Sequence, residues 1–85
     1  MVVLGSSRKN EMQATVVTFY TNADAMFASK VLGSLDNPGR LIPLPRAISA
    51  GCGYAWRDDP SKKELVTTTL NNAKVKFENI VDIEL

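Results

Sequence analysis

Four runs of apolar residues along the chain predict four strands. The clearest run, residues 14–20, reads Ala-Thr-Val-Val-Thr-Phe-Tyr, and such residues favour the pleated surface of a sheet. Further runs predict strands at residues 40–44, 53–57 and 77–85. The last run alternates apolar and acidic residues, which is typical of a strand with one buried face. Because Pro43 cannot donate a backbone hydrogen bond, it is predicted to lie in an edge strand or to face away from the neighbouring strand.

Two segments between these strands carry apolar residues at helical spacing. Thr21 and Asp24 have the spacing of an N-terminal capping box, and the apolar positions of residues 23–35 then fall on one face. Asp59 is a favourable N-cap and Pro60 suits the first helical position, which predicts a second helix after the third strand. Each predicted helix therefore has both a start signal and an apolar stripe.

The resulting order, β-α-β-β-α-β, predicts an α+β domain with the ferredoxin-like split βαβ arrangement. Its four strands would form one antiparallel sheet, with both helices on one face and the other face open. The residues expected in the core are Phe27, Val31, Leu35, Val66 and Leu70 from the helices, and Val17, Phe19, Ile42, Val81 and Ile83 from the strands. Tyr54 and Trp56 share one side of the third strand and are expected to cover the open face or to form a dimer contact.

The length of the chain, 85 residues, allows one small domain. Residues 1–12 are polar and small after the first four positions and predict a flexible leader, while residues 13–85 predict a single domain. A chain this small that leaves one face of its sheet uncovered buries little of its surface on folding. We therefore expect a homodimer or a larger homo-oligomer that covers this face or pairs an edge strand.

Composition and charge exclude several classes of function. A net charge of +1 argues against nucleic-acid binding driven by bulk charge. The lack of histidine excludes Ser-His-Asp and Cys-His catalysis, and one thiol with scattered carboxylates makes no metal site, so no metal or cofactor is expected. The single cysteine cannot form an internal disulfide and suits a reducing cytoplasm, and no apolar run is long enough to cross a membrane. So few catalytic groups favour a carrier or a binding module over a turnover enzyme.

The residues with the most distinctive chemistry lie between the second and third predicted strands. Cys52 stands between Gly51 and Gly53, whose backbone amides can approach an anion closely. Arg46 and Ser49 precede it in a stretch without acidic residues. Positive charge and amide donors stabilise a thiolate, which is the reactive form of cysteine. Cys52 is therefore a candidate nucleophile, partly accessible to solvent, with Arg46, Ser49, Gly51 and Gly53 as candidate binding residues. A purely structural role for Cys52 is equally open, because free cysteine is among the most buried residue types.

Three segments of the chain, residues 18–26, 39–46 and 48–53, resemble the selenium/sulfur carrier protein-like family of small bacterial domains. The run Pro-Arg-x-Ile-Ser-x-x-Cys-Gly carries most of the resemblance, which covers roughly residues 15 to 80. The resemblance implies a small α+β domain whose sulfur- or selenium-bearing cysteine falls on Cys52 and whose arginine falls on Arg46. It also implies partner proteins that handle sulfur or selenium.

Two functions follow as expectations. In the first, Cys52 relays sulfur or selenium between partner proteins as a persulfide or perselenide, which requires no histidine. In the second, the chain is a non-catalytic regulatory module that binds a protein or a small anion, and Cys52 only fills space. A buried Cys52 with Arg46 turned away would favour the second function.

Overall fold

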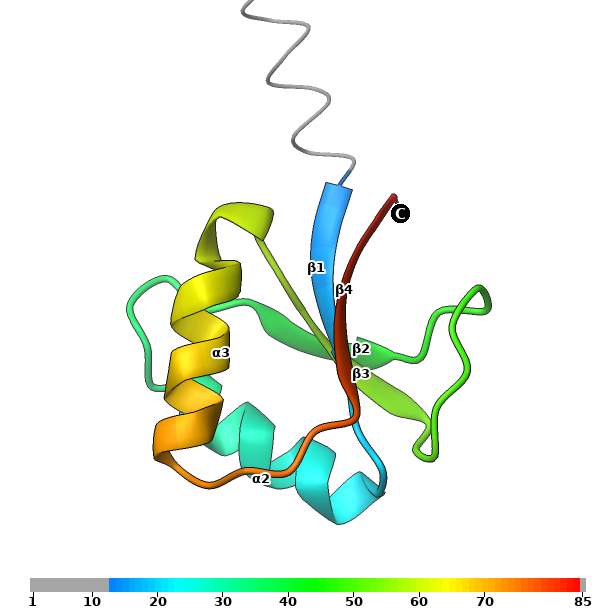
Figure 1. Ribbon diagram of the computed structural model, residues 1–85, viewed down its shortest axis with the longest axis horizontal. Coiled ribbons are helices and arrows are strands. Elements are labelled where there is room, and N and C mark those ends of the chain that lie inside the picture. The colour runs from blue at the N-terminus through cyan, green and yellow to red at the C-terminus, as the bar shows by residue number, and fades with distance from the viewer. Residues whose placement is uncertain (1–12, 85) are drawn as a thin grey trace, which may run out of the picture.

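The computed structural model describes residues 13–84, so the predicted leader, residues 1–12, lies outside the described residues (Figure 1). The elements are β1 (Gln13–Thr18), α2 (Asn22–Leu32), β2 (Arg40–Pro43), β3 (Tyr54–Asp58), the 3-10 helix η1 (Pro60–Lys62), α3 (Lys63–Asn72) and β4 (Asn79–Glu84). They confirm the predicted α+β class, with one four-stranded antiparallel sheet and two α-helices. The insertion of η1 before α3 means that the order is not a clean ferredoxin-like β-α-β-β-α-β.

The sheet has the strand order β2-β3-β1-β4, and every neighbouring pair is antiparallel. β1 lies at the centre, where Val17 is opposite Trp56 on one side and Ile80 on the other. Five consecutive residues of β1 are buried, because side chains on both of its faces are covered. β2 lies at an edge, as its proline predicted.

Both α-helices cover the same face of the sheet (Figure 1). We call the group of buried apolar residues on this side the helix-side core. Its buried members are Val17 from β1, Phe19 just after it, Trp56 from β3, Ala25, Ala28 and Leu32 from α2, Val66 and Leu70 from α3, and Cys52 and Val75 from the connecting segments. α2 presents two alanines toward the sheet, which lets the helix approach closely. Within the described residues, neither helix is long and apolar enough to cross a membrane.

The opposite face carries a second, smaller group of apolar residues, which we call the open-face cluster. Its buried members are Ala14, Val16 and Ala55, and its partly buried members are Ile42, Leu44, Ile48, Val81 and Ile83. Leu44 and Ile48 belong to the connection between β2 and β3, so this connection covers part of the open face.

The predicted core is therefore right for some residues and wrong for others. Ile42, Val81 and Ile83 lie in the open-face cluster and not beneath the helices, because the sheet register places their neighbours Leu41 and Ile80 on the helix side. The prediction for Phe27 is also wrong, since this residue is 48% exposed. The other predicted core residues pack in the helix-side core, as expected.

The expected placement of Trp56 is likewise wrong, because its indole lies on the helix side and is only 2% exposed. Its Nε1–H donates a hydrogen bond of 3.0 Å to Oδ2 of Asp58. The same oxygen accepts the Gly39 amide at 3.3 Å, and Oδ1 accepts the Asp59 amide at 2.8 Å. Gly39 must be glycine here, since a Cβ would lie 2.0 Å from the Arg57 carbonyl oxygen. Asp58 thereby joins β2, β3 and the start of η1.

We expect Asp58→Ala to lower the free energy of unfolding by about 2–3 kcal/mol, because it leaves the buried indole N–H and two backbone amides without an acceptor. Asp36→Ala is the matched control, since Asp36 is exposed, and it should change stability by less than about 0.5 kcal/mol. Urea unfolding followed by circular dichroism measures both. Equal stabilities for the two variants would contradict the role assigned to Asp58.

Candidate functional site

The candidate site lies in the connection between β2 and β3, residues 44–53, which we call the cysteine loop. Two backbone hydrogen bonds shape it. The Leu44 amide donates to the Gly53 carbonyl at 2.9 Å and closes the base of the loop, and the Ile48 amide donates to the Pro45 carbonyl at 3.0 Å in a turn. Figure 1 shows the loop projecting beyond the ends of β2 and β3. The sequence predicts this position of Cys52, immediately before the third strand.

Cys52 is more buried than predicted, with 5% of its surface exposed, and it packs in the helix-side core. The Tyr54 amide donates a hydrogen bond of 3.2 Å to Sγ, and the thiol donates to the Tyr54 carbonyl at 3.0 Å. An amide that donates to Sγ can also stabilise the negative charge of a thiolate. The donor is therefore the residue two positions after Cys52, whereas the sequence predicted its two glycine neighbours.

The two glycine amides bond to side chains from other elements instead. The Gly51 amide donates to Oε1 of Glu78, and the Gly53 amide donates to Oδ1 of Asn22, each at 3.3 Å. Sequence reasoning missed Asn22 and Glu78 because they lie far from the loop in the chain, and nothing in their local sequence marks them. They act as tethers that hold the cysteine loop against the start of α2 and the segment before β4.

Gly51 and Gly53 differ in the space around them. A Cβ on Gly51 would lie 2.4 Å from the Tyr20 carbonyl oxygen, whereas a Cβ on Gly53 would meet nothing within 4 Å. Neither glycine has a positive φ. The requirement for glycine at position 51 is therefore one of space, and position 53 has no such requirement.

Arg46 and Ser49 are exposed on the cysteine loop, with Arg46 in the turn. Within residues 13–84, neither side chain makes a hydrogen bond or an ion pair, so no polar contact joins Arg46 to the sulfur. The same residues contain no group of three side chains suited to hold a metal ion. The site thus consists of a shielded thiol beneath a loop that carries one free cation.

A comparison with models of protein families shows which family the chain belongs to. The family model described as "Putative Se/S carrier protein-like" matches residues 14–82, which is most of the sequence and includes the cysteine loop. The chain belongs to the Se/S carrier protein-like family. This confirms the resemblance seen in the sequence. No curated protein and no solved structure matches the chain.

The glycines of this Se/S carrier-like domain provide a matched pair of variants. We expect Gly51→Ala to push the cysteine loop away from Tyr20 and to weaken the tether to Glu78, so iodoacetamide should alkylate Cys52 several-fold faster than in the wild type. Gly53→Ala should leave the rate near the wild-type value because its Cβ has room. Equal rates for the two variants would show that the loop does not control access to the thiol.

Proposed function

We propose that the chain is a carrier in which Cys52 holds a sulfur or selenium atom as a persulfide or perselenide and passes it between partner proteins. The observation that carries this proposal is the place of the only cysteine. Cys52 lies in the cysteine loop, within the residues that the family model matches, and its Sγ accepts a hydrogen bond from the Tyr54 amide. Family membership supports partners that handle sulfur or selenium.

The transfer balances without an oxidant or a reductant. The Cys52 thiol loses its proton, and the thiolate attacks the outer sulfur of a persulfide on the donor protein. A new S–S bond forms on Cys52 while the S–S bond of the donor breaks, and the donor leaves as a thiolate. An acceptor thiolate then attacks the outer sulfur on Cys52 and releases the Cys52 thiolate. Selenium would follow the same steps.

Burial of the thiol is the outcome expected for the binding module, and a carrier accommodates it only if the cysteine loop opens for each transfer. A persulfide in the helix-side core is protected from other thiols and from oxidants, but a donor must displace the cysteine loop to reach it. The two tethers are long and solvent-exposed. A hydrogen bond contributes about 0.5–1.5 kcal/mol, so loss of either tether should make the loop open more readily, while the packing of Cys52 in the core opposes opening. Arg46 and Ser49, on the outer surface of the loop, would then face the partner, and Arg46 would stabilise the developing anion.

A second function, a non-catalytic module that binds a protein or a small anion, is favoured by one specific observation. Cys52 is only 5% exposed, and Arg46 makes no polar contact with it. In this alternative the thiol fills space in the core, and the exposed loop contacts the partner. The two functions differ in whether the thiol accepts sulfur.

We expect wild-type protein incubated with a persulfide donor to gain the mass of one sulfur atom, measured by intact-protein mass spectrometry, and Cys52→Ser to gain none. Asn22→Ala and Glu78→Ala should load several-fold faster, because each removes one tether. Glu64→Gln, an exposed change on α3, is the control and should load at the wild-type rate. If neither the wild type nor the folded variants that lack a tether gain sulfur, the carrier function is wrong and the binding module remains.

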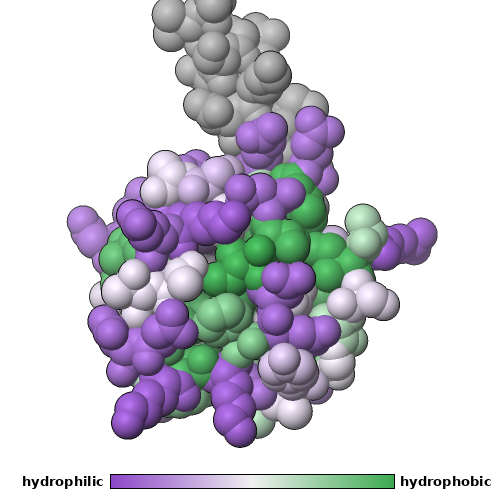
Figure 2. Space-filling view, in the orientation of Figure 1, coloured by the Kyte–Doolittle hydropathy of each residue, from purple (hydrophilic) through white to green (hydrophobic). Residues whose placement is uncertain are grey.

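We also propose that the chain forms a homodimer in a reducing cytoplasm. The partly exposed residues of the open-face cluster support self-association, and Figure 2 shows apolar residues gathered over β4 and toward β2. In the described part of the chain, β4 is also an edge strand, with β1 as its neighbour on one side.

Light scattering should therefore give twice the monomer mass at micromolar concentrations, and Val81→Glu should give a monomer because it places a charge within the cluster. Leu65→Glu alters a more exposed apolar residue on α3, outside the cluster, and should remain a dimer. A monomeric wild-type protein would contradict this proposal.

A further inference from the structure

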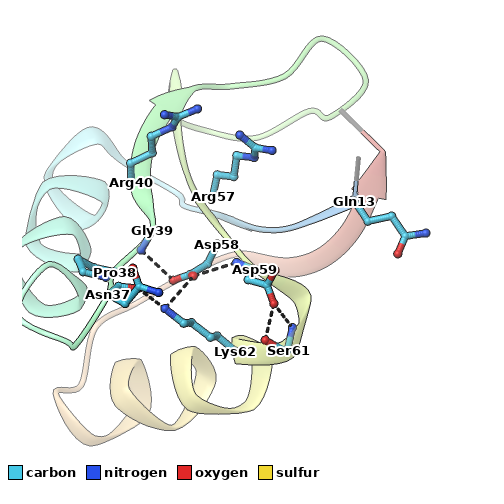
Figure 3. A pocket seen from close by; sticks show the side chains of 10 residues that line it. All are labelled: Gln13, Asn37, Pro38, Gly39, Arg40, Arg57, Asp58, Asp59, Ser61 and Lys62. Carbon is cyan, nitrogen blue, oxygen red and sulfur yellow. Dashed lines mark hydrogen bonds and ion pairs between the residues drawn. The ribbon is translucent and has the colours of Figure 1, made fainter. Parts of the chain in front are cut away.

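A depression of about 520 Å³ opens at the end of the β2–β3 hairpin opposite the cysteine loop (Figure 3). Its wall is formed by the start of β2, the end of β3, η1 and the first residue of β1. Cys52 does not line it, and nothing in the proposed carrier function uses it.

The floor of the depression has its polar groups already paired. Asp58 accepts the indole and amide hydrogen bonds described above, and Lys62 lies 4.0 Å from its Oδ1 and donates to the Asn37 carbonyl. Asp59 accepts the hydroxyl and the amide of Ser61. These two hydrogen bonds, with a smaller contribution from Lys62, hold the pKa of Asp59 below its ordinary value of 3.8. Both carboxylates therefore already accept hydrogen bonds from neighbouring groups of the protein.

The rim carries two cations without such neighbours. Arg40 and Arg57 are directly opposite each other on β2 and β3. Among the described residues, neither guanidinium makes a hydrogen bond or an ion pair. Figure 3 shows both side chains extending side by side, away from Asp58 and Asp59. The next residue across the sheet in this row is Val16, and Val81 follows it, so no carboxylate lies along the row.

Two like charges directly opposite each other on neighbouring strands destabilise the pair unless something neutralises them. Guanidinium groups are planar forks that bind tetrahedral oxyanions through paired N–H donors. The depression is in the size range of small-molecule sites. We propose that Arg40 and Arg57 together bind a small oxyanion of the phosphate or sulfate class at the rim of this depression. Asp58 and Asp59 exclude the anion from the floor, and Gln13 lines the same depression.

The experiment compares thermal unfolding in sodium phosphate, sodium sulfate and sodium chloride at equal ionic strength. For the wild type, we expect phosphate or sulfate to raise the unfolding temperature saturably above its value in chloride. Arg40→Gln and Arg57→Gln should each weaken the apparent affinity about tenfold, because each removes one charge-assisted contact. Lys30→Gln, which removes a cation from α2, should respond as the wild type does.

The controls separate specific binding from the general stabilisation that these salts give every protein. A response that is equal in the wild type and Arg40→Gln, or equal in chloride and the oxyanions, would overturn the proposal. Arg40 is exposed, so its variant should fold even if Arg57→Gln does not. Cys52→Ser should keep the full oxyanion response, which makes the test independent of the carrier function.

Discussion

The carboxylate of Asp58 is the contact on which the arrangement of the helix side depends. Its two oxygens accept hydrogen bonds from the indole of Trp56, from the amide of Gly39 just before β2 and from the amide of Asp59 just before η1. A buried carboxylate is tolerated only when its oxygens accept hydrogen bonds in this way, and here each of the three donors comes from a different part of the fold. The indole is thereby held beneath the helices, and the edge strand is held close enough to β3 that only glycine fits at position 39.

Much of the fold was predictable because its signals are local. The β-branched run of β1 and the cap of α2, where Thr21 accepts the Asp24 amide at 3.1 Å, follow from neighbours in sequence. Which face each strand residue occupies was not predictable. Ile42 and Val81 are as apolar as Leu41 and Ile80, and a shift of one position in register exchanges them between faces. The sequence likewise contained no sign that an indole would find its acceptor two residues along the same strand.

In the candidate site, too, the features set by neighbouring residues were predictable from the sequence, and those set by distant residues were not. The unusual composition around Cys52 was visible in the sequence, and the family match includes it. Its immediate environment was not, because the tethers to Asn22 and Glu78 join segments that are 31 and 27 positions away. A reactive cysteine and a structural one can share the same sequence pattern. What distinguishes them is how readily the surrounding loop opens and exposes the thiol to a partner. That depends on the contacts with Asn22 and Glu78.

The central position of β1 has a consequence for folding during synthesis. β1 is made early, yet one of its two partners is β4, and their register joins Gln13 to Glu84. Until β4 leaves the ribosome, one edge of β1 has no hydrogen-bonding partner, and the apolar residues on both of its faces lack part of their cover. Such long-range pairing slows folding, and it prolongs the time for which an unpaired strand edge can pair with another chain. The chain is therefore most prone to aggregation in the interval between the appearance of β1 and that of β4.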